Sequence, residues 1–139
     1  MKRKIKVLFL TVVIALNLIA CSSAPTTAEE YYTRPVVKAA LDAQIEKEGE
    51  TLKAQMQGIC SDFGYEVKGN TFTYWYKLTD QIGDSAVAKE QLEGSITEAQ
   101  LSEMVTSIEE ECGIEGITLQ YIYYKSDGSV LCEISHKND

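Results

Sequence analysis

The chain has 139 residues, of which 45% are hydrophobic and 24% are charged, and its net charge is −8. This length fits one domain of ordinary size and is too short for two. The excess of acidic residues makes nucleic acid a poor partner, because binding a phosphate backbone depends on Lys and Arg.

The first 21 residues predict a bacterial lipoprotein signal. A basic start over residues 1–6 precedes an apolar run over 7–20, which is shorter than the roughly 20 residues that a membrane-spanning helix needs. The run closes on Leu18-Ile19-Ala20-Cys21, in which a small residue directly precedes a cysteine. The segment resembles bacterial lipoprotein signals, which implies cleavage before Cys21 and a thioether-linked diacylglycerol on its sulfur.

Two other interpretations of this segment stay open: an ordinary secretory signal followed by a chance cysteine, and a transmembrane helix. A diacylglycerol would supply two acyl chains, enough for a stable anchor. We therefore expect residues 1–20 to be a removed signal and the protein to be attached to the cell membrane, on its extracytoplasmic face, through Cys21. The 119 residues that remain carry nine basic and 21 acidic side chains, a net charge of −12.

Residues 21–32 are expected to form a flexible tether, because the stretch Ser22–Glu30 is small, polar and proline-bearing. Order is expected from Thr33, which can cap a helix whose first turn contains Pro35. Gly49 interrupts the pattern and is expected to weaken or bend this helix, and Gly58 is expected to end it. The apolar residues at helical spacing are Val37, Leu41, Ile45, Leu52, Met56 and Ile59.

Alternating residues then predict a β-hairpin around a two-residue turn at Gly69-Asn70. This turn would pair Val67 with Phe72, Tyr65 with Tyr74 and Phe63 with Tyr76, which places all six apolar side chains on one face. The hydrophobic pattern and the turn position agree on the same register.

A second helical region follows Asp80. Asp84 can cap a first piece, Gly94-Ser95 interrupts it, and Thr97 with Gln100 three residues later has the spacing of a capping box. Gly113 is expected to end the second piece. Its buried stripe is predicted to be Leu101, Met104, Val105, Ile108 and Cys112. The acidic triplet Glu109-Glu110-Glu111 lies at the unfavourable end of the helix dipole.

A second hairpin closes the chain around a turn at Asp127-Gly128. Pairing across this turn would place Tyr123 opposite Cys132 and Tyr121 opposite Ile134. The order helix, hairpin, helix, hairpin predicts a single α+β domain over residues 33–137. We expect a two-layer sandwich with a four-stranded, mainly antiparallel sheet and both helices on one face.

If the helices cover the tyrosine-rich face, the opposite face presents several large apolar side chains. Such a patch is typical of binding sites, and Trp and Tyr are enriched at binding hot spots. The alternative is that these residues are β-formers shielded by cross-strand neighbours. The candidate binding surface consists of Trp75, Ile122, Tyr124 and Leu131.

No catalytic, cofactor or metal-binding pattern is evident. His136 is the only histidine and is expected to be a solvated residue near the end of the chain. There is no Gly-x-Ser-x-Gly elbow, phosphate loop or His-Glu-x-x-His motif, and no Cys-x-x-Cys pair. Cys60, Cys112 and Cys132 allow at most one disulfide, and spacing alone does not pair them. We therefore expect no enzymatic activity, no cofactor and no metal.

The domain resembles small Gram-positive lipoproteins of unknown function, over roughly residues 33–136. The resemblance rests on the lipoprotein signal and on two hairpin phrases, Val67–Tyr74 and Tyr123–Val130. It implies the helix–hairpin arrangement and no particular activity. Two functions are expected: a membrane-tethered module that uses the exposed sheet face to bind an envelope protein, a peptide or a small ligand, or a passive accessory lipoprotein without a specific ligand.

Overall fold

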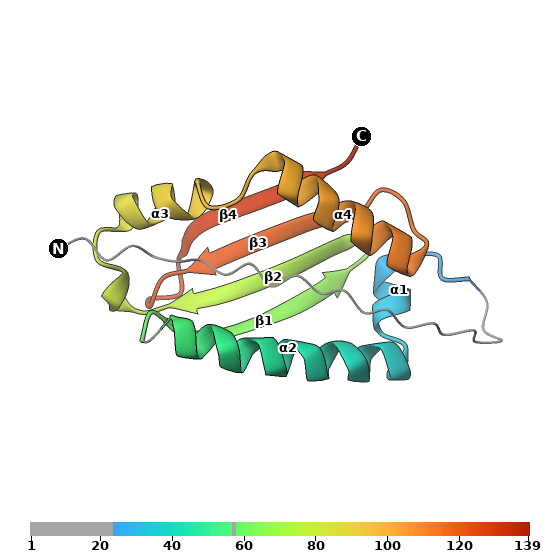
Figure 1. Ribbon diagram of the computed structural model, residues 1–139, viewed down its shortest axis with the longest axis horizontal. Helices are drawn as coiled ribbons and strands as arrows, with labels where there is room; N and C mark the ends of the chain where they lie inside the picture. The colour runs from blue at the N-terminus through green and yellow to red at the C-terminus, as the bar shows by residue number, and fades with distance from the viewer. Residues whose placement is uncertain (1–23, 57) are drawn as a thin grey trace.

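The computed structural model describes residues 24–56 and 58–139; Cys21 and the signal lie outside these ranges. The fold is α+β, with one four-stranded sheet (Figure 1). The elements in chain order are α1 (Ala28–Tyr32), α2 (Pro35–Gln55), β1 (Cys60–Lys68), β2 (Thr71–Leu78), the 3-10 turn η1 (Asp80–Ile82), α3 (Ser85–Glu93), α4 (Glu98–Cys112), β3 (Thr118–Tyr124) and β4 (Val130–Lys137).

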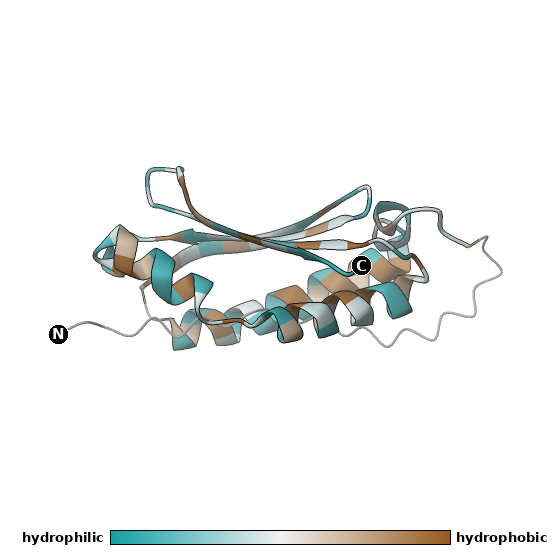
Figure 2. Cartoon of the chain, turned by 90° about the horizontal axis from the view of Figure 1, so that it is seen from above, coloured by the Kyte–Doolittle hydropathy of each residue, from teal (hydrophilic) through white to brown (hydrophobic). Residues whose placement is uncertain are grey.

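The strands lie in the order β1-β2-β3-β4, so the predicted fold class is confirmed. Each hairpin is antiparallel, whereas the two hairpins meet through a parallel pairing of β2 with β3. Parallel neighbours need a long crossover, which α3 and α4 provide. Figure 2 shows the sheet edge-on, with the long helices running in a second layer beneath it.

Both predicted hairpin registers are confirmed by the structure. Tyr65 lies opposite Tyr74 in the first hairpin, and Tyr121 lies opposite Ile134 in the second. The parallel junction adds stacked rings across β2 and β3: the Tyr76 and Tyr123 centroids are 4.9 Å apart. The core face of the sheet is therefore a layer of buried aromatic rings, made by Phe72, Tyr74, Tyr76, Tyr121 and Tyr123.

The second hairpin contains an irregularity that the simple pairing rule missed. The register shifts between Tyr123 and Tyr124, so that Tyr124 lies opposite Val130 instead of Leu131. Leu131 becomes the extra residue and is only 7% exposed, within the hydrophobic core. The prediction that Leu131 belongs to the candidate binding surface is therefore wrong, because a β-bulge changes the residue facing the neighbouring strand.

Helix α2 is continuous through Gly49, where we expected a weakening or bend. The glycine is buried, and the Phe63 ring of β1 lies against it. The absence of a side chain lets the strand approach the helix closely. The helix is therefore not broken at Gly49, and the glycine serves helix–strand packing.

The ordered domain begins earlier than Thr33. Residues Ala28–Tyr32 form helix α1, capped by Thr27, and Tyr32 is 2% exposed. The Tyr32 ring meets Phe72 edge-on at 5.0 Å, and its hydroxyl donates a hydrogen bond of 3.3 Å to Glu111 Oε2. The expectation of a flexible tether through residue 32 is therefore wrong. Thr27 with Glu30 three residues later has the spacing of a helix start, and contacts with the sheet order the short helix.

Helix α1 also binds the turn of the first hairpin. The Glu29 backbone N–H donates to the Gly69 carbonyl at 2.9 Å, and the Gly69 N–H donates to Glu29 Oε2 at 2.7 Å. The Asn70 side chain accepts from the Ala28 N–H at 3.1 Å. These three bonds fix the start of the domain to one end of the sheet (Figure 1).

The second helical region agrees with its predicted capping signals. Asp84 caps α3, and Thr97 and Gln100 form the capping box of α4. Gly113 ends α4 in a left-handed conformation. The acidic triplet has local partners: besides the bond from Tyr32 to Glu111, Glu109 Oε2 accepts from the Gly116 N–H at 3.0 Å.

The three cysteines of the described residues are buried free thiols: Cys60, Cys112 and Cys132. Burial raises the pKa of each thiol, which disfavours the reactive thiolate. His136 lies in strand β4, not in a solvated tail, and its Nε2 is 2.9 Å from Asn138 Oδ1.

Candidate functional site

The candidate surface is reduced to three of its four residues. Trp75, Ile122 and Tyr124 are all half-buried, whereas Leu131 is in the core. Trp75 lies directly opposite Ile122 in the parallel pair, so the two side chains are neighbours. Beside them, Gln120 Nε2 donates to Glu133 Oε1 at 2.5 Å. The open face is thus a mixed surface with a small apolar centre.

Trp75 is placed by a glycine on the neighbouring strand. Gly64 lies opposite Trp75, and a β-carbon at position 64 would fall 2.5 Å from Trp75 Cζ2. The indole therefore lies across β1 and reaches the outer edge of the sheet. This packing supports the alternative that cross-strand neighbours shield the open face, and it also brings Trp75 to a pocket.

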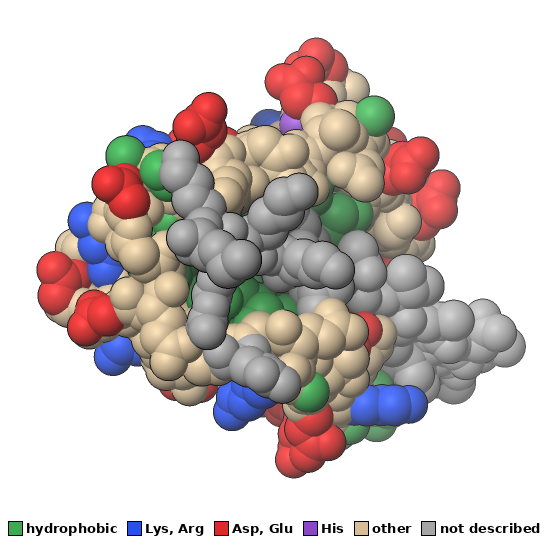
Figure 3. All heavy atoms as spheres, turned by 60° about the vertical axis from the view of Figure 1, so that its left-hand side comes forward, with side chains coloured by type: hydrophobic (Ala, Val, Ile, Leu, Met, Phe, Trp, Pro, Cys, Tyr) green, Lys and Arg blue, Asp and Glu red, His purple; other side chains and the backbone are tan. Residues whose placement is uncertain are grey.

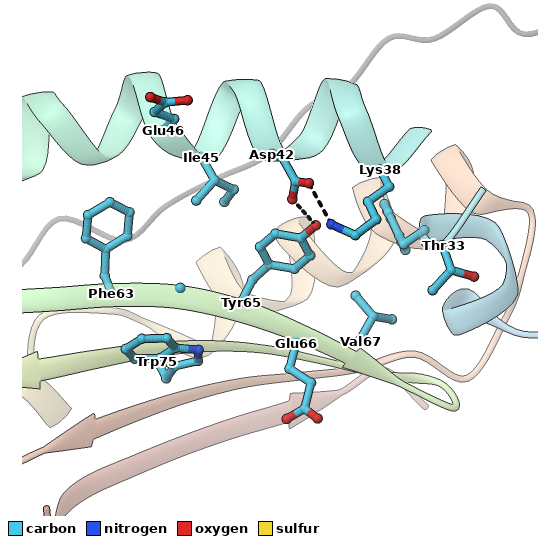
Figure 4. Close-up of a pocket in the computed structure, with 12 residues that line it drawn as sticks. Thr33, Lys38, Asp42, Ile45, Glu46, Phe63, Tyr65, Glu66, Val67 and Trp75 are labelled. Atoms are coloured by element: carbon cyan, nitrogen blue, oxygen red, sulfur yellow. Dashed lines mark hydrogen bonds and ion pairs between the residues drawn. The ribbon is translucent and has the colours of Figure 1, made fainter. Parts of the chain in front are cut away.

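The pocket has a volume of about 510 Å³ and lies between the flank of α2 and the edge of β1 (Figure 4). Its volume is within the range typical of ligand sites. Figure 4 shows Phe63 and Tyr65 pointing toward α2 and Glu66 pointing the other way. The lining residues are Tyr32, Thr33, Lys38, Asp42, Ile45, Glu46, Phe63, Gly64, Tyr65, Glu66, Val67 and Trp75.

A hydrogen-bonded group of three side chains forms the polar wall of this pocket. Asp42 Oδ1 accepts from the Tyr65 hydroxyl at 2.5 Å, and Asp42 Oδ2 accepts from Lys38 Nζ at 2.6 Å. Lys38 and Asp42 are one helical turn apart, the spacing at which side chains on a helix meet. The group thus joins α2 to β1 across the pocket.

Two members of this group, Asp42 and Tyr65, have shifted pKa values. Hydrogen bonds from Lys38 and Tyr65 lower the pKa of Asp42, which keeps it a carboxylate. Partial burial, followed by the bond to Asp42, raises the pKa of Tyr65 well above its ordinary value. Tyr65 is therefore a protonated donor at neutral pH, and its hydroxyl is not poised for proton abstraction.

The remaining charges of the pocket are mainly acidic. Glu46 and Glu66 line it in addition to Asp42, and Lys38 is the one basic residue among the described residues that line it. The Lys53 ammonium lies 5.5 Å from the centre of the Phe63 ring. Figure 3 shows that acidic side chains elsewhere are spread around another face of the molecule among Lys and Arg, without one concentrated patch.

Sequence patterns pointed to only one residue of this pocket, Trp75. Asp42 and Tyr65 are 23 positions apart and meet only because α2 packs beside β1. Alternation indicated that Tyr65 faces the helices, but it gave no sign that the helix flank leaves space there. Among the described residues, no cluster of His, Cys, Asp and Glu is arranged to hold a metal ion.

Comparison with protein families gives one match. A family described as "Domain of unknown function (DUF4854)" covers residues 28–136. Its first residue is also the first residue of α1, which agrees with α1 being part of the domain. No curated protein and no solved structure matches the chain. Within the described residues, no helix has the length and apolar character needed to cross a bilayer.

Proposed function

The chain belongs to the family defined by the domain of unknown function DUF4854, and we propose that this member is a lipid-anchored, extracytoplasmic binding module. Its ligand site is the pocket between α2 and β1. The module is not an enzyme. A passive accessory lipoprotein without a ligand is the competing proposal.

The anchor part of the proposal rests on Leu18-Ile19-Ala20-Cys21, outside the described residues. Metabolic labelling with an alkyne fatty acid tests it directly. The wild-type protein should incorporate the label, Cys21→Ala should lose it, and the control Cys60→Ala should keep it. Label retained on Cys21→Ala would contradict lipidation at this sulfur.

The binding part rests on one observation: the pocket combines an apolar floor with the bonded group of Lys38, Asp42 and Tyr65. Ligand sites commonly combine an apolar lining with a few oriented polar groups. The proposal that the module is not an enzyme rests on the sequence, in which no catalytic motif is evident.

A pocket-filling variant tests the site. Glu46→Trp places a large ring in the pocket from an exposed helix position, whereas Lys47→Trp adds the same ring at an exposed position that does not line it. Saturation-transfer NMR with a fragment library should give hits on the wild type that Glu46→Trp loses and Lys47→Trp keeps. Identical hits on all three proteins, or none on any, would favour the passive accessory role.

A further inference from the structure

We propose that the free edge of β1 accepts an extended polypeptide segment carrying basic side chains, which pairs with β1 as a fifth strand beside the α2 pocket. This inference rests on the proposed function and names its ligand class. Addition of a peptide strand to a sheet edge is a common mode of recognition, in which backbone bonds supply affinity and pockets supply specificity.

The pairing pattern of the hairpin determines which backbone groups face outward. Lys68 and Thr71 flank the two-residue turn, so they form a hydrogen-bonded pair. Counting back by twos, Glu66 and Gly64 also bond to β2. The N–H and C=O groups of Val67, Tyr65 and Phe63 therefore point away from the sheet. β1 is the first strand of the sheet order, so no described strand pairs with this side.

This edge is closed at its ends and open in the middle. At one end, Gly69 is bonded to Glu29 of α1. At the other end, the Phe63 N–H donates to Asp62 Oδ1 at 2.9 Å. Between them, Tyr65 and Val67 have outward backbone groups with no strand or side chain of the described residues bonded to them. Natural edges are commonly blocked by Lys, Pro, a β-bulge or a covering element. Phe63–Val67 contains no Lys or Pro, and the irregularity of β1 lies before it, between Cys60 and Asp62.

The surroundings of the edge determine the side chains that fit. On an added strand, alternate side chains would point toward α2 and toward the open face. The first set would enter the pocket beside Asp42 and Glu46, and the second would lie near Glu66 and the edge of Trp75. The described residues of the pocket lining carry three carboxylates and one ammonium group, and that ammonium group, on Lys38, is already bound to Asp42. The lining is therefore negatively charged, which favours basic side chains on the partner.

The test uses two fluorescein-labelled peptides of eight residues, one alternating lysine with valine and the other glutamate with valine. The protein, in the form that the expressing cell produces, is added to each labelled peptide, and binding is followed by fluorescence anisotropy. The lysine peptide should bind at least about tenfold more tightly than the glutamate peptide, and added salt should reduce the difference.

A proline variant separates strand pairing from simple charge attraction. Val67→Pro removes an outward N–H without breaking a bond to β2, a position at which edge strands tolerate proline. Val67→Pro should weaken binding of the lysine peptide at least about tenfold, whereas the control Val67→Thr should change the affinity by less than about twofold. Circular dichroism checks that both variants fold.

Three outcomes overturn the inference. Equal binding by Val67→Pro and wild type would exclude strand addition. Sedimentation showing a dimer that Val67→Pro abolishes would identify the occupant as a second copy of the chain. If neither peptide binds while fragments still bind the pocket, the polypeptide ligand is excluded and the proposed function is kept. If the fragments do not bind either, both the polypeptide ligand and the proposed function are excluded.

Discussion

The Phe63 ring lies so close to Gly49 that a β-carbon at position 49 would fall 1.7 Å from Phe63 Cζ. On an exposed helix, Gly→Ala stabilises by about 1 kcal/mol. Here the new methyl group must displace a ring packed between α2 and β1. We expect Gly49→Ala to lower the free energy of unfolding by about 1–3 kcal/mol, measured by urea denaturation.

Removing the obstacle should reverse the sign of this effect. In a background of Phe63→Ala, Gly49→Ala should stabilise the protein, as it would in an ordinary helix. The two substitutions therefore form a double-mutant cycle with a coupling energy of at least about 1 kcal/mol. Additive effects would show that the close approach does not exist in solution.

The indole of Trp75 should report on Gly64. Gly64→Ala places a methyl group 2.5 Å from Trp75 Cζ2, so the ring must move away from the strand. Because the chain has a single tryptophan, emission reports this ring alone. We expect a red shift of the emission maximum in Gly64→Ala. Ser135→Ala, an exposed change on β4 two strands away from Trp75, should leave the emission maximum unchanged.

Tyr32 tests whether α1 belongs to the domain. Tyr32→Ala removes a ring that packs on Phe72 and should cost about 3–5 kcal/mol of unfolding free energy. Tyr32→Phe keeps the ring and loses only the bond to Glu111, a cost of about 1 kcal/mol. Thermal unfolding of the two variants gives the comparison. If both variants are as stable as the wild type, residues 28–32 belong to the tether and not to the folded domain.

Because of Asp42, the free energy of unfolding should depend on pH in the acidic range. The pKa of Asp42 is lower in the folded state than the value of about 3.9 expected in the unfolded state. Its contribution to the free energy of unfolding is therefore fully present above about pH 3.9 and is lost as the pH falls through the folded-state pKa. The stability difference between wild type and Asp42→Asn should therefore shrink from pH 6 to pH 3. Since the pair with Lys38 is about half exposed, the difference should stay below about 1 kcal/mol.

A control separates this bonded carboxylate from the general effect of acid. Glu46 lies one turn further along α2 and lines the same pocket. Glu46→Gln removes a carboxylate of the pocket without removing a bond to Lys38 or Tyr65, so it should not reproduce the effect of Asp42→Asn in the same urea titrations. If Asp42→Asn and Glu46→Gln behave alike, the bonds from Lys38 and Tyr65 do not hold Asp42 in solution.

Local patterns predicted the parts of the fold that local physics determines. The registers Tyr65–Tyr74 and Tyr121–Ile134 follow from alternation and turn length, and the cap at Thr97 follows from its own hydrogen bonds. The bulge at Leu131 was not predictable, because an extra residue in a strand leaves the apolar composition unchanged.

Other features required tertiary knowledge. Gly49 is unfavourable for an isolated helix, and only the position of Phe63 explains it. Five residues of α1 are too few to form a helix alone and depend on contacts with the sheet. The pocket is a space between a helix flank and a strand edge, so no spacing within the sequence marks it. Trp75 was found because its residue type is unusual on an open sheet.

The bonds between α1 and the Gly69-Asn70 turn limit how far the domain can stand from the bilayer. With a lipid on Cys21, only residues 22–27 separate the anchor from α1, and six residues span at most roughly 20 Å. The hairpin tip would then be the membrane-proximal pole of the domain. A molecule that reaches the β1 edge would then have to approach within a few nanometres of the lipid headgroups. A partner that is itself held at the membrane would meet this edge more often than a partner free in solution.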